Sequence, residues 1–183
     1  GGSFNPAHEG HVHVSDVALR RLGLDQVWWL VSPQNPLKSA DGMADYDQRF
    51  AQAQAVATHP RIKVSDFERR AGTQYTVDTL RRLTCRRPDD RFVWLMGADN
   101  LAGFHRWKEW QTIAHLMPFA VIDRPGSAAK ALSSRAANNL RAYRLDEGDA
   151  PCLSSQHAPA WLFLTGPRNG QSATAIRNEG DWP

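Results

Sequence analysis

Short apolar runs of strand length alternate along this chain of 183 residues with segments whose apolar residues recur at helical spacing. The strands are predicted at residues 26–31, 62–65, 92–96, 119–122 and 161–164. The helices are predicted at residues 11–22, 45–58, 75–86 and 109–116, and from residue 172 onward. Strands that alternate with helices indicate βαβ units, which build a parallel sheet with right-handed crossovers.

The predicted fold class is therefore α/β, with a doubly wound, mostly parallel sheet and helices on both faces. The length suits a single domain over residues 1–183. Because the Gly-Gly turn at the start needs a strand to leave from, we expect the first strand to precede Gly1. The stretch 126–160 is predicted to be a helix followed by a loop. In such a sheet, ligand sites lie at the carboxyl ends of the strands.

The chain opens with Gly1-Gly2-Ser3-Phe4-Asn5-Pro6-Ala7-His8-Glu9-Gly10-His11, its most informative segment. Glycines in a turn present bare backbone amides, and the apolar period that begins after His11 predicts a helix start. N–H groups at a helix N-terminus favour phosphate, and two imidazoles beside them add hydrogen bonds or charge. A plainer interpretation is a helix start with satisfied histidines, but Gly10 between them indicates that something approaches closely.

Four segments resemble the nucleotidyltransferase superfamily and, within it, the bacterial nicotinate-nucleotide adenylyltransferases. The opening Gly-Gly-Ser-Phe-Asn-Pro with its His-x-Gly-His resembles the first signature, and Ser-Ala-Thr-Ala-Ile-Arg at 172–177 resembles the second. Residues 72–79 (Gly-Thr-Gln-Tyr-Thr-Val-Asp-Thr) and 96–107 resemble that one branch. The match runs nearly end to end, and four motifs in the family's order are far more specific than His-x-Gly-His alone.

The resemblance implies a Rossmann-like nucleotidyltransferase fold and the transfer of AMP from ATP to nicotinate mononucleotide. The products would be pyrophosphate and deamido-NAD (nicotinate adenine dinucleotide), made in NAD biosynthesis by direct in-line attack without a covalent intermediate. A mononucleotide phosphate has a second pKa of about 6 and is largely dianionic at neutral pH. The reaction therefore needs positioning and electrostatic stabilisation, not a general base.

The resemblance also implies roles for individual residues. The catalytic residues at the triphosphate would be His8, His11 and Arg177. The ATP-binding residues would be Gly2, Ser3, Phe4, Gly97, Asp99, Arg124, Ser172 and Thr174. The mononucleotide-binding residues would be Lys38, Tyr75, Thr76 and Trp107. Leu37 stands where the family often has a histidine before the lysine, and for Arg49 a solvated helix position is favoured over the site.

Several of these residues also have plainer interpretations. Ser172 and Thr174 would suit an ordinary N-cap, and Asp99 a turn or an N-cap. Trp107 would suit the core, but its polar neighbours favour stacking on a flat pyridine ring. The sequence contains no metal-ligand spacing, so Mg²⁺ is expected on the ATP phosphates, with mostly water ligands and no protein cage.

Composition limits the other possibilities. The chain is 42% hydrophobic and 22% charged, as in ordinary globular proteins, and its net charge of +3 comes from scattered basic pairs. This pattern favours a small anionic substrate over nucleic acid. No apolar run approaches membrane-spanning length, and no signal peptide is visible. Two cysteines without metal or disulfide spacing fit a cytoplasmic protein. The sequence leaves the oligomeric state open, including a homo-oligomer.

Alternatives remain within and beyond this enzyme class. Trp107 and the Tyr75-Thr76 segment argue against phosphopantetheine as the acceptor, whereas nicotinamide mononucleotide differs from the acid only by its carboxamide. A non-catalytic nucleotide-binding sensor on the same fold is a further alternative. The presence of both phosphate motifs argues against it. A nucleic-acid binder would need a clustered basic face and a steep salt dependence.

Overall fold

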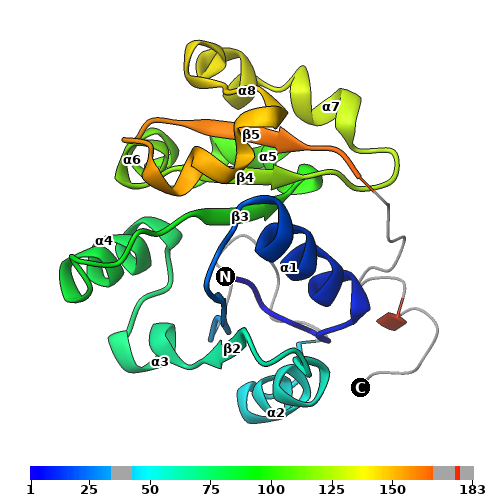
Figure 1. Ribbon diagram of the computed structural model, residues 1–183. Coiled ribbons are helices and arrows are strands. Elements are labelled where there is room, and N and C mark those ends of the chain that lie inside the picture. Colours follow the sequence, from blue (N-terminus) through cyan, green and yellow to red (C-terminus); the bar gives the residue numbers. More distant parts are fainter. Residues whose placement is uncertain (34–42, 167–175, 178–183) are drawn as a thin grey trace.

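The computed structural model describes residues 1–33, 43–166 and 176–177 (Figure 1). Its strands are β1 (Val27–Leu30), β2 (Ile62–Ser65), β3 (Trp94–Gly97), β4 (Phe119–Ile122) and β5 (Trp161–Leu164). Its α-helices are α1 (Glu9–Arg21), α2 (Tyr46–Val56), α3 (Phe67–Ala71), α4 (Thr76–Arg86), α5 (Ala98–Gly103), α6 (Trp110–Leu116), α7 (Ala128–Leu132) and α8 (Arg135–Asn139). Its 3₁₀ helices are η1 (Phe104–Arg106), η2 (Arg141–Tyr143) and η3 (Glu147–Ser155).

All pairs of neighbouring strands run parallel. β1 pairs with β2, with Val27 opposite Ile62, and β4 lies between β3 and β5 in a second sheet. The opening segment joins the first sheet at the carboxyl end of β1, where Gly2 forms a parallel bridge with Val31. The Gly2 amide donates to the Leu30 carbonyl over 3.1 Å, and the Ser32 amide donates to the Gly2 carbonyl over 2.9 Å. The predicted α/β class with parallel strands is confirmed.

Alternate residues of β4 divide the core into two faces. Ala120 and Ile122 belong to a buried cluster with α1, and this helix packs on both β1 and β4 (Figure 1). Phe119 and Val121 belong to a second cluster on the other face, with residues of α5 and α6. Burying an apolar side chain of this size stabilises the fold by about 1.5–3 kcal/mol. Apolar packing thus holds the strands in place, and the polar residues at the strand ends are not part of this core.

Several short elements depart from the sequence-based expectations. The helices α3 and α5 have five and six residues, too few to show a helical period in the sequence. The expectation of one helix and a loop over 126–160 is wrong, because this stretch contains α7, α8, η2 and η3. The Ser134 hydroxyl accepts a hydrogen bond from the Ala137 amide, and this cap begins α8 inside the stretch that was expected to hold one helix and a loop.

The final helix predicted from residue 172 lies outside the described residues, apart from Ile176 and Arg177, which are helical. Across the described parts of the chain, no helix combines the length and the hydrophobicity that crossing a bilayer requires.

Candidate active site

The N-terminus of α1 carries both histidines of the opening motif. His8 is the N-cap residue, and its Nδ1 accepts a hydrogen bond from the Gly10 amide over 3.1 Å. The Nδ1 of His11 accepts one from the His8 amide over 3.2 Å. The centroids of the two rings lie 4.0 Å apart. The rings therefore satisfy amides of the helix start and are fixed side by side by doing so.

Both imidazoles are neutral, and each presents the same kind of hydrogen-bond donor. Because each Nδ1 accepts a main-chain hydrogen bond, the single ring proton of each histidine lies on Nε2. Burial lowers the pKa of His8 to about 4, and the Arg124 guanidinium adds to this effect. Burial also lowers the pKa of His11 to about 3, with further lowering by His8 and Arg124. Each ring thus offers an Nε2–H group at neutral pH.

Aromatic and hydroxyl side chains hold the His11 ring in place. Its centroid lies 4.8 Å from that of Phe4 and 5.8 Å from that of Trp29. Phe4 stacks on Trp29 at 5.2 Å. The Trp29 indole N–H donates to the Ser15 hydroxyl over 2.8 Å, and this hydroxyl donates to the His11 carbonyl over 2.9 Å. The ring is consequently fixed by neighbours from β1, α1 and the opening turn.

Polar residues after β3 and β4 lie near the histidines. Asp99, in the first turn of α5, has its Oδ1 3.6 Å from Nε of Arg124, which follows β4. The effect of Arg124 on the pKa of both histidines means that its charge lies within electrostatic reach of them. A Cβ on Gly97 would overlap the Asp99 carboxylate and lie 3.0 Å from Arg124 Nε. A side chain at this position would therefore displace the Asp99 carboxylate and the Arg124 side chain.

The C-terminal motif reaches the opening turn through Arg177, whose Nη1 donates to the main-chain carbonyl of Asn5. This contact brings the two ends of the chain together, as the sequence predicts for a shared phosphate site. Ser172, Thr174 and Lys38 lie outside the described residues, so the roles expected of them stay predictions.

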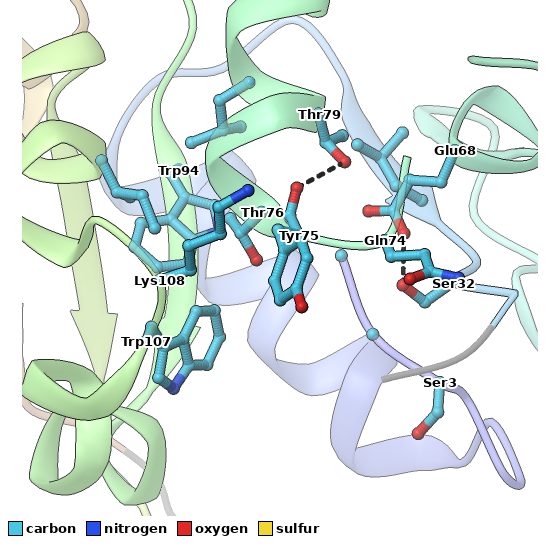
Figure 2. A pocket seen from close by; sticks show the side chains of 15 residues that line it. Ser3, Ser32, Glu68, Gln74, Tyr75, Thr76, Thr79, Trp94, Trp107 and Lys108 are labelled. Atoms are coloured by element: carbon cyan, nitrogen blue, oxygen red, sulfur yellow. Dashed lines mark hydrogen bonds between the residues drawn. The ribbon is translucent and has the colours of Figure 1, made fainter. Parts of the chain in front are cut away.

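A cavity of about 100 Å³ lies beside this turn (Figure 2). Gly2 and Ser3 line it together with Tyr75, Thr76 and Trp107. In Figure 2 the Tyr75 and Trp107 rings lie near one another, and Glu68 and Ser32 lie on the other side of Tyr75. The structure thus brings three of the four residues expected to bind the mononucleotide to one cavity, next to residues expected to bind ATP.

Trp107 both packs on the core and lines the cavity. Its ring makes tilted edge contacts with Trp94 and Phe104, at centroid distances of 5.6 and 5.8 Å. Trp110 packs on the same Phe104 ring at 5.7 Å but does not line the cavity. Of the two tryptophans, Trp107 is therefore the one placed to contact a ligand.

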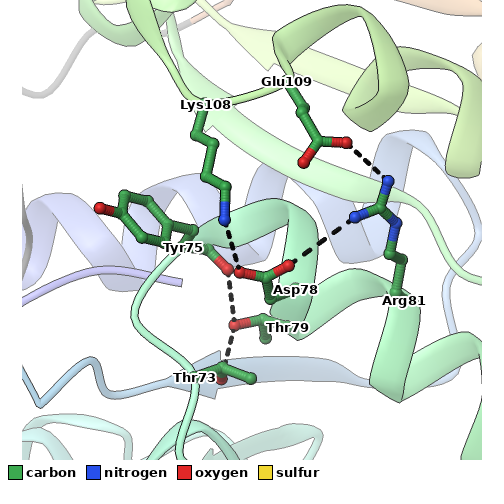
Figure 3. A network of polar contacts seen from close by, with 7 residues as sticks. All are labelled: Thr73, Tyr75, Asp78, Thr79, Arg81, Lys108 and Glu109. Carbon is green, nitrogen blue, oxygen red and sulfur yellow. Dashed lines mark hydrogen bonds and ion pairs between the residues drawn. The ribbon is translucent and has the colours of Figure 1, made fainter.

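The facing wall is the start of α4, which hydroxyl groups hold in place (Figure 3). Tyr75 is the N-cap residue, and the buried Thr79 hydroxyl lies 2.9 Å from the Thr73 hydroxyl and 3.3 Å from the Tyr75 carbonyl. The first amides of a helix have no intrahelical acceptor. Thr76, the first residue of α4, therefore brings such an amide to the cavity wall.

A chain of alternating charges joins the two walls (Figure 3). Lys108 Nζ lies 3.3 Å from Asp78 Oδ2, and Arg81 lies 3.8 Å from Asp78 Oδ1 and 2.6 Å from Glu109 Oε2. Glu109 has a φ of +49°, which is unfavourable for a non-glycine residue. These side chains are partly exposed, so each pair contributes only about 0–1 kcal/mol. Together these ion pairs link Lys108 and Glu109, which follow Trp107, to the helix α4.

The sequence does not reveal two buried ionisable residues near the turn. The expectation that Arg49 is solvated is wrong, because it is 1% exposed. Glu68 is also buried, which raises its pKa, and it accepts a hydrogen bond from the Ser32 hydroxyl. Both residues lie in segments whose other polar residues are mostly exposed, so no sequence signal separates them from a solvated helix face.

Comparisons with known proteins identify the family of this chain. The model of the cytidylyltransferase-like family matches residues 1–179. A relative from Parvibaculum lavamentivorans, named "probable nicotinate-nucleotide adenylyltransferase", is 59% identical over all of this chain and 90% of its own. One of the same name from Methylorubrum extorquens is 57% identical over 97% of this chain and 96% of its own. This chain belongs to the nicotinate-nucleotide adenylyltransferases of the cytidylyltransferase-like family.

A comparison with solved structures finds the same fold. The Plasmodium falciparum nicotinic acid mononucleotide adenylyltransferase complexed with NaAD superposes with a TM-score of 0.70 at 17% identity. That superposition covers 97% of this chain and 80% of the other. Among the described residues, no three His, Cys, Asp or Glu side chains are grouped so that they could hold a metal ion.

The lowered histidine pKa values predict acid sensitivity of the fold. The unfolded chain takes up protons on these rings as the pH falls below about 6.5, whereas the folded protein does so only near pH 3–4. The free energy of unfolding should therefore fall between pH 6.5 and pH 4. Thermal melts across this range should show a smaller fall for His11→Gln than for the exposed control His115→Gln. Equal slopes would contradict burial of a neutral His11.

Proposed function

We propose that this protein transfers AMP from ATP to nicotinate mononucleotide, which yields deamido-NAD and pyrophosphate. The observation that carries the proposal is the pair of neutral Nε2–H donors, from His8 and His11, beside an aromatic-walled cavity. A phosphate oxygen of the mononucleotide forms a bond to the α-phosphorus of ATP. The bond from that phosphorus to the α–β bridging oxygen breaks, and its electron pair leaves with pyrophosphate. Residues 1–183 act in this proposal as one nucleotidyltransferase domain.

The proposed roles at the phosphates follow from charge and hydrogen bonding. Two phosphate groups repel one another, and a neutral imidazole N–H lowers that repulsion without requiring a proton transfer. The nucleophile is largely dianionic at neutral pH, so the reaction needs no general base. The lowered pKa values of His8 and His11, which make these rings weak bases, are therefore compatible with it. Arg124 supplies the fixed positive charge near these rings. Catalysis then rests on positioning and on donors that are already oriented.

The proposed mononucleotide site is the cavity between Trp107 and α4. A pyridine ring suits stacking on the Trp107 indole. The nicotinate carboxylate suits the N-terminus of α4 at Thr76, because free amides and the helix dipole favour an anion there. A carboxamide gains less from that dipole, which is the basis for preferring the acid.

Mg²⁺ in this proposal is carried by the ATP phosphates, where it neutralises charge and orients the triphosphate. The half-exposed Asp99 carboxylate has the oxygen ligands that this ion and its bound waters prefer. The two imidazoles do not suit the ion, because each directs a proton and not a lone pair from Nε2. The exposed free thiols of Cys85 and Cys152 support a cytoplasmic location.

Pyrophosphate release tests the proposed reaction directly. The protein, ATP and Mg²⁺ should release pyrophosphate faster with nicotinate mononucleotide than with nicotinamide mononucleotide at equal concentration, because only the acid gains the full helix-dipole term. Turnover of the amide at an equal or higher rate would overturn the acid preference. Binding of both substrates without release would favour the non-catalytic sensor.

Replacement of His11 tests the role of the neutral donor. His11→Ala should lower kcat about 10²–10³-fold, the usual loss for one oriented donor at a developing charge. The KM for the mononucleotide should stay within about threefold, because the donor acts mainly in the transition state. The control His115→Ala removes an exposed histidine on α6 and should leave both constants unchanged. Losses of equal size in kcat and in mononucleotide affinity would contradict this role.

Replacement of Trp107 tests the ring site. Trp107→Ala should raise the dissociation constant of the mononucleotide about tenfold or more, since stacking on an aromatic side chain contributes about 1–3 kcal/mol. Isothermal titration calorimetry measures this change. Trp110→Ala is the matched control, because Trp110 also packs on Phe104 but does not line the cavity. If Trp107→Ala leaves the affinity for the mononucleotide unchanged, Trp107 has only a structural role.

A further inference from the structure

Arg49 is a buried cation that donates four hydrogen bonds to main-chain carbonyls. The residue lies on the first turn of α2 and is 1% exposed. Its Nε donates to the Ala44 carbonyl over 3.0 Å and its Nη2 to the Pro33 carbonyl over 2.9 Å. Its Nη1 donates to the carbonyls of Ser3 and Ser32, over 2.6 and 2.8 Å. Four of the five N–H groups of one side chain thus connect three separate segments.

The bond to Ser3 fixes the orientation of one particular amide. The peptide between Ser3 and Phe4 is trans, since the cis peptide bonds in the described part of the chain are Asn5-Pro6 and Ala158-Pro159. In a trans peptide the carbonyl and the next amide N–H lie in one rigid plane and point in opposite directions within it. With the Ser3 oxygen held toward Arg49, the Phe4 N–H is directed away from it. Among the described residues this N–H has no hydrogen-bond partner.

The backbone at Phe4 does not hold this orientation by itself. Phe4 has a φ of +46°, a conformation that a residue with a side chain rarely adopts unless its surroundings impose it. The neighbouring contacts are the Arg49 bond to Ser3 on one side and the Arg177 bond to Asn5 on the other. The stacking of Phe4 on Trp29 fixes its side chain. Arg49 is therefore the group that sets the plane of the Ser3–Phe4 peptide.

We infer that Arg49 is a positioning residue for ATP: by holding the Ser3 carbonyl from below, it directs the Phe4 amide as a donor to a phosphate oxygen. This inference rests on the proposed function and deepens it, because it assigns a cause to the geometry of the opening turn. Arg49 itself touches no substrate, being covered by the carbonyls that it binds. A lysine cannot replace it, because one ammonium cannot reach carbonyls that a forked guanidinium bonds from three nitrogens.

The decisive variant is Arg49→Lys, compared with the control Arg61→Lys. Arg61 also donates to a main-chain carbonyl, that of Leu24 over 3.3 Å, but it precedes β2, at the amino end of the strands and away from the turn. Arg49→Lys should lower kcat at least about tenfold, with the KM for the mononucleotide within about threefold. The control should keep both constants. A kcat of Arg49→Lys within twofold of the wild type would overturn the inference.

A second measurement does not depend on turnover. In ¹H–¹⁵N spectra of the wild type, the Phe4 amide should shift downfield on addition of ATP with Mg²⁺, and this shift should be lost in Arg49→Lys. An equal shift in both proteins would overturn the inference even if no pyrophosphate is formed. Absence of pyrophosphate release by the wild type, with the Phe4 shift intact, would instead count against the proposed reaction alone.

Chemical rescue covers the case in which Arg49→Lys does not fold. In Arg49→Ala, added guanidinium at sub-denaturing concentration should restore kcat in a saturable way, whereas an equal concentration of sodium chloride should not. If neither variant folds, or if guanidinium restores the melting temperature without restoring kcat, Arg49 has only a structural role and the inference is wrong.

Discussion

An anion site made of backbone amides has to keep those donors both rigid and unpaired. In a folded protein these demands conflict, because a backbone group is normally held in place by its own hydrogen bond. The opening turn resolves the conflict by fixing the carbonyls in place of the amides. Arg49 holds the carbonyl of Ser3, and Arg177 holds that of Asn5. Since the Ser3–Phe4 peptide is a rigid plane, fixing the Ser3 oxygen also fixes the Phe4 N–H group. The Asn5–Pro6 peptide has no N–H group, so the Arg177 bond holds the backbone of the turn and orients no amide.

The same solution recurs in the histidines. Their Nδ1 atoms accept hydrogen bonds from amides of the helix start, which fixes the rings and leaves Nε2–H as the outward donor. Burial keeps the rings neutral. The parallel strands place these groups together, because Val31, Gly97 and Asp123 all lie at carboxyl ends of their strands. The apolar core holds the strands, so the site can be polar and strained without supplying the stability of the fold.

Sequence patterns predict much of this arrangement. The five strands and the helices α1, α2, α4 and α6 follow from periodicity, because each presents a repeated apolar face. The cavity residues Tyr75, Thr76 and Trp107 follow from the resemblance to the family. What could not be predicted depends on tertiary contacts. Arg49 lies in a helix of ordinary polar composition, and only the carbonyls that converge on it explain its burial. The helices α7 and α8 have five residues each, which is too few to show a helical period in the sequence.

In the proposed reaction, the opening turn, the two histidines and the Trp107 cavity form one site for both substrates. A crystal structure of the protein with a non-hydrolysable ATP analogue, Mg²⁺ and nicotinate mononucleotide tests it most directly. We expect phosphate oxygens about 3 Å from Nε2 of His8 or His11 and from the Phe4 amide, with the pyridine ring against Trp107. A triphosphate bound with none of its oxygens within hydrogen-bond distance of these donors would contradict it.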